Sequence, residues 1–352
     1  MTYLKNLTLY GKTVDIGIED GKIAAIEDRD PRREGTDFGG AKVYPGLIDI
    51  HSHGCIGLDT CTGGVEEMAD WQLAHGITTW YPTTMTVSRE DIIKATEVDI
   101  SFKHGANVPG FHLEGPFINL KYKGAQNPEY VIPPSLDMVK ECKNVKLITV
   151  APEVEGAIEF IKNTDAVVAI GHTDCDYDTA MEAFRAGAKS LTHTFNCMNG
   201  IHHRNPGPIP AGMDSGAYAQ LITDGKHIHP SVVRSLYKMY GADRITLISD
   251  SIQATAVGDG SYVFGGLDIV VKDGVARTLG GNRAGSTTNL FECVKCAISF
   301  GICEEDAVKM ASTTPAELMG LNKGRIEVGY DADLIIVDND FNLIKAIARG
   351  EL

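Results

Sequence analysis

The middle of the chain, from about residue 46 to residue 321, alternates short apolar runs with stretches of helical character. A helix candidate such as Val65–His75 is followed by Gly76, where a glycine suits a left-handed C-terminal cap. The eight apolar runs are Leu47–Ile50, Thr78–Pro82, Pro109–Leu113, Leu147–Val150, Val167–Ile170, Ser190–Thr192, Ala219–Ile222 and Ile245–Ser249. Alternation of this kind predicts a parallel α/β sheet, and eight units predict a (β/α)8 TIM-type barrel.

Both ends of the chain have a different, strand-like pattern. Near the N-terminus, two alternating runs are separated by Asp20-Gly21, which is a hairpin signal. The tail repeats this style in Gly324–Val328 and Asp333–Val337. We expect residues 1–45 and 322–352 to form one small β-sandwich domain beside a catalytic barrel of residues 46–321.

Composition and charge narrow the class of protein. With 43% hydrophobic and 22% charged residues, the chain has the make-up of a globular enzyme. The net charge of −15 argues against a nucleic-acid partner, although a few local cations could still bind a small phosphorylated substrate. The eight cysteines are scattered, and neither an export signal nor a membrane-length apolar run is seen. We therefore expect a reduced, cytoplasmic protein without a membrane partner.

Two histidines, His51 and His53, directly follow the first apolar run. In an extended backbone, residues i and i+2 point to the same side, so both imidazoles can reach one ion. This spacing indicates a metal site. By itself it also fits two solvated loop histidines, because a His-x-His pair is common in a chain with 11 histidines.

Further metal-ligand residues come at the ends of other predicted strands. Glu114 follows the third run, His172 comes two residues after the fifth, His193 follows the sixth and Asp250 follows the eighth. Because the active site of such a barrel gathers at the carboxyl ends of its strands, we expect these side chains to meet at one rim. Scattered surface residues would not all fall at strand ends.

Histidine and carboxylate ligands suit zinc, iron or manganese. The pattern favours two adjacent ions, one held by His51, His53 and Asp250 and the other by His172 and His193. Glu114 can bridge them, since a carboxylate has two oxygens. Two cations also acidify a shared water near neutral pH, and Asp250 is then the candidate general base and acid.

The motifs of the chain resemble those of the N-acetylglucosamine-6-phosphate deacetylases, a family of the amidohydrolase superfamily. The similarity runs over nearly the whole length. The motifs that carry it are Pro45–Gly54, His112–Phe117, Gly171–Thr173, Thr192–Met198, His202–Gly207, Asp224–His227, Ile248–Ser251, Ala284–Ser286 and Gly324–Leu334.

The resemblance implies hydrolysis of a linear carbon–nitrogen amide bond, with removal of acetate from the 2-acetamido group of an amino-sugar 6-phosphate. An activated water would attack the carbonyl, and Asp250 would protonate the departing amine. The family's motifs map substrate contacts onto Asn196, the backbone of Cys197, Arg204 and His227. An arginine at the position of Arg204 can serve the neighbouring subunit's site in this family, which implies a homodimer.

Two positions bear on how this chain compares with its family. Some members keep one metal because weaker ligands replace the first His-x-His, whereas this chain retains His51 and His53, so we expect two ions. Where the family pattern usually has histidine, this chain has Gln126. Only imidazole can become cationic, so Gln126 is either a tolerated replacement in a substrate contact or the mark of a different sugar.

Three other functions stay open at this stage. One is deacetylation of the epimeric N-acetylgalactosamine-6-phosphate, and another is hydrolysis of a cyclic amide by a relative in the same superfamily. Cyclic-amide hydrolases generally bridge their metals with a modified lysine after strand four, and here that strand is followed by Ala151-Pro-Glu153. The third is a silent metal- or sugar-phosphate-binding protein, which the presence of Asp250 disfavours.

Overall fold

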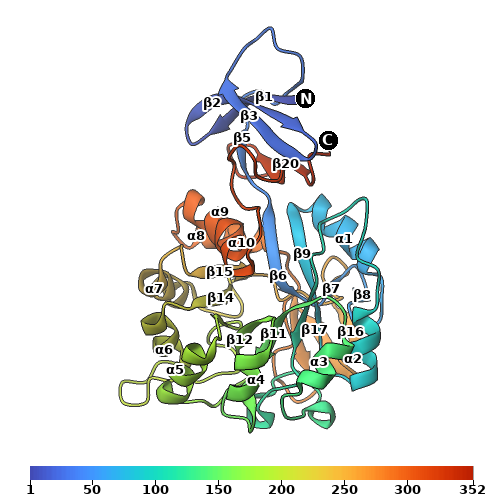
Figure 1. Cartoon of the computed structure of the whole chain (residues 1–352), viewed down its shortest axis with the longest axis vertical. Coiled ribbons are helices and arrows are strands. Elements are labelled where there is room, and N and C mark those ends of the chain that lie inside the picture. The colour runs from blue at the N-terminus through green and yellow to red at the C-terminus, as the bar shows by residue number, and fades with distance from the viewer. Residues whose placement is uncertain (352) are drawn as a thin grey trace.

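The computed structural model describes residues 1–351 and shows a barrel with a smaller sheet at one end (Figure 1). All eight predicted barrel strands are present and pair in parallel in the order β15-β14-β13-β12-β11-β10-β9-β6. They are β6 Leu47–Ser52, β9 Ile77–Thr84, β10 Phe111–Glu114, β11 Val145–Val150, β12 Val167–Ile170, β13 Ser190–Leu191, β14 Tyr218–Ile222 and β15 Ile245–Ile248. The predicted TIM-type fold is confirmed.

The first and last strands of the barrel lie side by side, and hydrogen bonds join β6 to the residues that follow β15. The backbone N–H of Asp250 donates to the carbonyl oxygen of His51 over 2.9 Å. Behind this bond, the hydroxyl of Ser249 donates to the buried carboxylate of Asp49 over 2.5 Å. These contacts bring the residues after the first strand and those after the last strand to the same part of the barrel rim.

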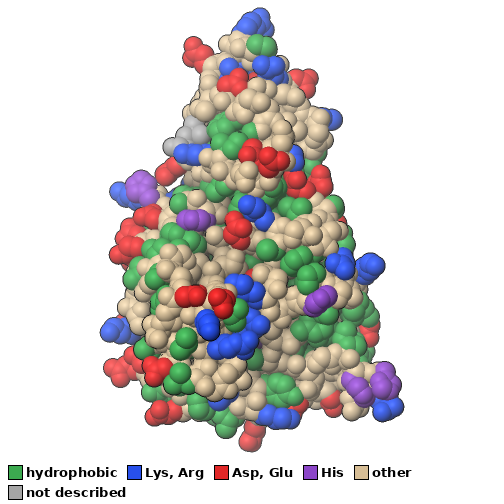
Figure 2. Space-filling model, turned by 180° about the vertical axis from the view of Figure 1, so that it is seen from behind, with side chains coloured by type: hydrophobic (Ala, Val, Ile, Leu, Met, Phe, Trp, Pro, Cys, Tyr) green, Lys and Arg blue, Asp and Glu red, His purple; other side chains and the backbone are tan. Residues whose placement is uncertain are grey.

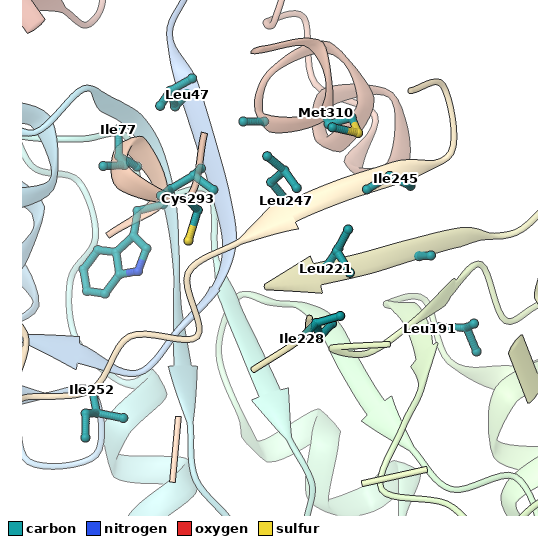
Figure 3. Packing of buried hydrophobic residues seen from close by; sticks show 14 of the residues in the cluster. Leu47, Ile77, Leu191, Leu221, Ile228, Ile245, Leu247, Ile252, Cys293 and Met310 are labelled. Carbon is teal, nitrogen blue, oxygen red and sulfur yellow. The ribbon is translucent and has the colours of Figure 1, made fainter. Parts of the chain in front are cut away.

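Helices surround the barrel, as the alternating pattern predicts. The described residues contain ten α-helices: α1 Val65–Ala74, α2 Arg89–Thr96, α3 Leu136–Glu141, α4 Ala157–Asn163, α5 Tyr177–Ala186, α6 Pro208–Ser215, α7 Pro230–Tyr240, α8 Leu290–Ser299, α9 Glu304–Ala311 and α10 Thr313–Met319. Two short 3-10 turns are Leu120–Tyr122 and Pro128–Tyr130. Figure 3 shows Leu221 and Leu247 on the outside of β14 and β15, with Met310 of α9 and Cys293 of α8 in the same buried cluster.

The inside of the barrel has its own apolar packing. Ile48, Ile222 and Ile248 are buried together with Leu318 of α10. Neighbouring strand residues therefore alternate between the inner cluster and the layer below the helices, as the two-residue period of a strand requires. The filled interior makes the barrel a rigid support for residues on its rim.

The two chain ends meet in one sheet at the top of Figure 1. Its strands pair in the order β20-β19-β5-β1-β2-β3, and β4 pairs with β1. They are β1 Thr2–Leu9, β2 Lys12–Glu19, β3 Lys22–Asp28, β4 Thr36–Asp37, β5 Lys42–Pro45, β19 Leu334–Val337 and β20 Leu343–Ile347. Leu4, Ile16 and Ile336 belong to a separate buried cluster within this sheet. The exact domain boundaries expected from the sequence stay a prediction.

A buried carboxylate, Asp333, ties this terminal sheet to the barrel. Its Oδ2 accepts from the ammonium of Lys323 over 2.6 Å and from the amide of Asn107 over 3.0 Å. Its Oδ1 accepts from the backbone N–H of Arg349 over 2.7 Å. Cation and hydrogen-bond donors therefore come from both parts of the chain, and they satisfy the charge of Asp333 locally.

An antiparallel sheet that the sequence analysis did not predict follows the last barrel strand. It consists of β16 Gly260–Phe264, β17 Leu267–Lys272 and β18 Val275–Thr278. Asp273-Gly274 forms the turn between β17 and β18, and a small hairpin of β7 Gly54–Cys55 and β8 Leu58–Asp59 lies after β6. The Asp-Gly turn was an available hairpin signal within the span assigned to the barrel.

The surface of the molecule mixes charges of both signs. On the face opposite to that of Figure 1, acidic and basic side chains are interspersed, and one group of Lys and Arg side chains lies in the lower part of the molecule (Figure 2). No helix within residues 1–351 combines the length and the hydropathy needed to cross a bilayer.

Candidate metal centre and substrate cavity

The structure brings together the six predicted ligand residues at the carboxyl end of the barrel. His51 lies in β6 with His53 just after it, and Glu114 is the last residue of β10. His172, His193 and Asp250 each come two residues after a strand and have left-handed φ values of 50°, 24° and 50°. Such backbone conformations are strained for residues with a side chain and cluster at functional sites.

The ligand atoms form two groups that share Glu114. One group is His51, His53 and Glu114, and the other is Glu114, His172 and His193, with the ligand atoms of each group within 4.8 Å of one another. Glu114 Oε1 lies 3.2 Å from Nε2 of His172 and 2.9 Å from Nε2 of His193. Glu114 Oε2 lies 3.2 Å from Nε2 of His53. A shared carboxylate between two triads is the arrangement of a bridged pair of ions.

In three of the imidazoles, the ring nitrogen that points away from Glu114 forms a hydrogen bond. That bond fixes the position of the ring proton. Nδ1 of His51 lies 3.0 Å from the amide oxygen of Gln220. Nδ1 of His53 lies 3.1 Å from the carbonyl oxygen of Thr83, and Nδ1 of His172 lies 2.8 Å from that of Tyr122. Each Nδ1 therefore donates, so in the neutral ring Nε2 presents a lone pair to the carboxylate.

The two triads suit a bound cation. Without one, electron pairs of the imidazoles and the carboxylate face each other. Lone pairs of Nε2 and carboxylate oxygens repel each other unless a proton or a metal ion lies between them. Nε2 of His172 and Nε2 of His193 also face each other at 3.1 Å, and Nε2 of His51 is buried without a hydrogen bond. The chemistry of the donors, imidazole and carboxylate without thiolate, suits zinc, iron or manganese.

The same electrostatics appear in the pKa values of the metal-free cluster. Burial opposes the charged form of His53, but hydrogen bonds to Asp250 and Glu114 outweigh it and raise the pKa of this ring to about 10. Burial likewise disfavours the Glu114 carboxylate, yet the surrounding imidazoles hold its pKa well below the usual range. In the absence of a metal, protons take the place of the ion between these groups.

Asp250 lies beside both triads. Its Oδ1 is 3.3 Å from Nε2 of His53 and 3.5 Å from Nε2 of His51. The sequence predicts His51, His53 and Asp250 at the first ion, with Glu114 bridging to the second. The mutually close set contains His51, His53 and the bridging Glu114 but not Asp250. Burial raises the pKa of Asp250, but the hydrogen bond to His53 and the imidazole charges lower it overall, so the carboxylate is available as a base.

The segment that contains Gly285 packs closely against the backbone of Asp250. Gly285 has a φ of 59°, and a Cβ atom there would lie 2.8 Å from the carbonyl oxygen of Asp250. The backbone N–H of Ser286 donates to the same carbonyl over 2.7 Å. The segment after β18 therefore holds the strained residue Asp250 in place.

A cavity of about 260 Å³ opens above the two triads. Four of the residues predicted to contact substrate line it: Gln126, Asn196, Cys197 and His227. Arg204, the fifth, does not line this cavity and is exposed on the loop between β13 and α6. Within one chain, the predicted phosphate partner and the metal ligands are therefore not brought together.

Gln126 is buried and its amide orientation is fixed by its neighbours. Its Oε1 accepts from the backbone N–H of Thr86 over 2.7 Å, so its Nε2 must point the other way. Nε2 donates to Oε2 of Glu114 over 2.5 Å. Gln126, which the family resemblance predicts to contact substrate, therefore also orients the carboxylate shared by the two triads.

The cavity also has lining residues that the sequence pattern did not indicate, and they come from the β16–β18 sheet and the segment after it. Phe264 ends β16 and lies edge-on to the ring of His53, with ring centroids 5.2 Å apart. Asn282 and Arg283 follow β18 and also line the cavity. The signal available in the sequence was their position next to the quoted motif Ala284–Ser286, within a segment whose hairpin turn was overlooked.

Comparisons with known proteins agree with this geometry. Residues 43–352 match the amidohydrolase family. The N-acetylglucosamine-6-phosphate deacetylase of Vibrio furnissii is 35% identical over 361 residues, which cover 97% of this chain and 90% of the relative. The chain belongs to the N-acetylglucosamine-6-phosphate deacetylase family of the amidohydrolases.

Two further relatives of this deacetylase family extend the comparison. The N-acetylgalactosamine-6-phosphate deacetylase of Escherichia coli O157:H7 is 32% identical over 95% of this chain and 93% of its own length. The structure of a mutant N-acetyl-D-glucosamine-6-phosphate deacetylase from Mycobacterium smegmatis in complex with N-acetyl-D-glucosamine-6-phosphate superposes with a TM-score of 0.91. It is 30% identical, and the match covers 99% of this chain and 98% of that one. Family membership thus covers both the barrel and the terminal sheet.

Proposed function

We propose that this chain hydrolyses N-acetylglucosamine-6-phosphate to glucosamine-6-phosphate and acetate with the help of one or two divalent ions. The observation that carries the proposal is the position of Asp250, a buried carboxylate 3.3 Å from His53, beside two ligand triads that share Glu114. The deacetylase relatives supply the substrate class. Hydrolysis of an unreactive amide needs both an acidified water and a proton carrier, and this rim has groups for both.

Two ions are expected, since both triads are intact. His51, His53 and Glu114 would hold one ion, and Glu114, His172 and His193 would hold the other. When bound, such ions lower the pKa of a water and polarise the acetamido carbonyl. Zinc, iron and manganese all suit the donors, and metal analysis of the purified chain will distinguish them.

Asp250 acts on the protons of the reaction. Its low pKa keeps it ionised at neutral pH, so it can accept a proton from the attacking water. It then donates that proton to the nitrogen of the sugar as the carbon–nitrogen bond breaks. Because its backbone is fixed by Gly285 and Ser286, the carboxylate stays in position during both transfers.

The remaining side chains of the cavity would bind the sugar phosphate. Asn196, the backbone of Cys197, Gln126 and His227 lie along its wall, and the ring of His227 is held by Asp224 over 2.8 Å. We further propose a homodimer in which Arg204 serves the neighbouring subunit, since it lies outside the cavity of its own chain. Light scattering that gives the mass of a monomer would contradict this assembly.

A residue that follows strand β11 bears on the alternative of a cyclic-amide hydrolase. Glu153, after strand β11, is already used: it accepts from Thr173 over 2.5 Å and from Asn119 over 2.7 Å. This position therefore supplies no metal bridge of the cyclic-amide type.

The eight cysteines are free, which supports the cytoplasmic location expected from the sequence.

The experiment that tests the proposed function is a substrate panel. The chain, loaded separately with zinc, iron(II) or manganese, is incubated with N-acetylglucosamine-6-phosphate, N-acetylgalactosamine-6-phosphate and N-acetylglucosamine, and acetate is measured. We expect the first substrate to give the highest kcat/KM. Preference for the galactosamine epimer would assign the chain to the activity of the Escherichia coli relative. No acetate from any substrate would contradict the proposal.

A further inference from the structure

Arg283 is the one arginine or lysine whose side chain lines the cavity above the metal ligands, among residues 1–351. It follows β18 in the sheet that the sequence analysis did not predict. Within the same described residues, its guanidinium forms no ion pair and no hydrogen bond, and no carboxylate lies within salt-bridge distance. A half-buried guanidinium beside a polar cavity has five N–H groups available for a ligand.

The backbone at Arg283 is firmly held. Residues Arg277 and Arg283 face each other in an antiparallel bridge. The N–H of Thr278 donates to the carbonyl of Asn282 over 2.9 Å, and the N–H of Ala284 donates to the carbonyl of Ala276 over 3.1 Å. The root of the Arg283 side chain is therefore fixed by bonds on both sides, which reduces the entropy lost when it binds a ligand.

Hydrogen bonds also join the β16–β18 sheet and the segment after it to two loops that contribute residues to the cavity wall. The side-chain amide of Asn282 donates to the carbonyl of Gly124 over 3.3 Å. The ammonium of Lys226, beside His227, donates to the carbonyl of Gly274 over 2.7 Å. The sheet is thus part of the cavity wall, and Arg283 lies in that wall between residues that are themselves tied down.

Other polar side chains of the cavity already use donors elsewhere. Nε2 of Gln126 donates to Glu114, and Nδ2 of Asn196 donates to the carbonyl of His193 over 3.2 Å. Nδ1 of His227 is held by Asp224 over 2.8 Å, so only the other ring nitrogen is left for a ligand. Glu114 and Asp250 are acceptors. Arg283 is therefore the cavity side chain that offers a full set of unused N–H donors.

We infer that Arg283 binds the anionic phosphate of the substrate and makes the site of each chain specific for phosphorylated sugars. The inference rests on the proposed function for the identity of the substrate. A guanidinium can contact two phosphate oxygens at once, which a lysine cannot do in the same geometry. Charge at position 283, in the same chain as the metal ligands, then sets the preference for the sugar phosphate over the neutral sugar.

The test compares Arg283→Met with the matched variant Arg277→Met. Arg277 lies opposite Arg283 in the same sheet, but its guanidinium donates to the carbonyl of Gly281 over 3.0 Å and does not line the cavity. Binding of glucosamine-6-phosphate and of glucosamine to the metal-loaded chain is measured by calorimetry. KM and kcat are measured for N-acetylglucosamine-6-phosphate and for N-acetylglucosamine.

We expect Arg283→Met to weaken glucosamine-6-phosphate binding and to raise KM for the phosphorylated substrate on the order of 10- to 100-fold, with little change in kcat. Binding of glucosamine and turnover of N-acetylglucosamine should be unchanged, and Arg277→Met should behave as the wild type. Arg283→Lys should have a KM and a glucosamine-6-phosphate affinity between those of Arg283→Met and the wild type. The lysine keeps the charge but loses the contact with two phosphate oxygens. Equal melting temperatures of the three variants will show that they are folded.

Three results would overturn the inference. The first is equal weakening of phosphorylated and neutral ligands in Arg283→Met, which would indicate a general loss of the cavity wall. The second is unchanged glucosamine-6-phosphate binding in Arg283→Met, and the third is no glucosamine-6-phosphate binding by the wild type. If the wild type releases no acetate but binds glucosamine-6-phosphate through Arg283, the proposed function fails and the inference about Arg283 stands.

Discussion

Two buried carboxylates in this chain are almost equally hidden from solvent but have opposite surroundings. Asp333, at the junction of the terminal sheet and the barrel, is 2% exposed, and Glu114, in the candidate metal centre, is 3% exposed. Asp333 receives an ammonium, an amide and a backbone N–H from the chain itself. Glu114 receives one amide and otherwise faces four imidazoles.

The difference separates a structural carboxylate from a functional one. The charge of Asp333 is compensated by Lys323 in the folded chain, so nothing further is needed at that position. Glu114 has no lysine or arginine partner within residues 1–351, and the imidazoles around it turn lone pairs toward it. Burial alone therefore does not identify the site, whereas a buried charge that only a proton or an ion can balance does.

The largest effect is expected for Glu114→Gln. The amide removes the shared negative charge from both triads, so the chain should bind substantially less metal. Since a divalent ion lowers the pKa of a water from about 15.7 to near 7, we expect deacetylation to fall on the order of 10³-fold or more. Metal content by mass spectrometry and acetate release are measured on the same sample. Full metal content with full activity would remove Glu114 from the centre.

Asp333→Ala should act on stability and leave chemistry intact. Loss of the carboxylate leaves Asn107 and the backbone N–H of Arg349 without their buried acceptor and Lys323 with Asp331 alone, which we expect to lower the free energy of unfolding by about 3 kcal/mol. Urea denaturation measures this change, and kcat of the folded variant should equal that of the wild type. The control is Glu317→Gln, which breaks an exposed pair with Arg325 and should cost less than about 1 kcal/mol. Reduced metal binding in Asp333→Ala would erase the contrast between the two carboxylates.

Gln126→Ala should have smaller effects, one on the stability of the fold and one on metal affinity. The variant leaves the backbone N–H of Thr86 without its partner, which should cost about 1–2 kcal/mol in the free energy of unfolding. It also frees Oε2 of Glu114, and loss of such an outer contact typically changes metal affinity about 10-fold. Competition with a chelator of known affinity measures the second quantity. Unchanged metal affinity would restrict Gln126 to packing or to substrate contact.

The pH dependence of the metal-free chain provides the subtlest test. The folded-state pKa of His53 is about 10, above its unfolded value of about 6.5, so the stability it contributes is fully present below about pH 6.5. That stability should be lost as the pH rises toward about 10. Metal binding should remove this dependence and release about one proton or more near pH 7.5. Calorimetry in two buffers of different ionisation enthalpy measures the release, and equal heats would contradict the assignment.

The parts of the fold and site that follow from local pattern could be predicted. The eight strands are short apolar runs, and residues such as His172 and His193 follow them directly, so the geometry of a barrel places them on one rim. The position of Arg283 depends on how the β16–β18 sheet folds over the rim. The contact of Gln126 with Thr86 depends on two segments 40 residues apart. Long-range contacts of this kind leave no periodic signal in the sequence.

The most direct test of the account is acetate release by Asp250→Asn from N-acetylglucosamine-6-phosphate, with bound metal measured in the same preparation. The amide keeps the shape of the side chain and removes its ability to accept a proton. We predict metal content close to that of the wild type and a kcat lower on the order of 10³-fold. An Asp250→Asn variant that binds metal and deacetylates as fast as the wild type would contradict the account.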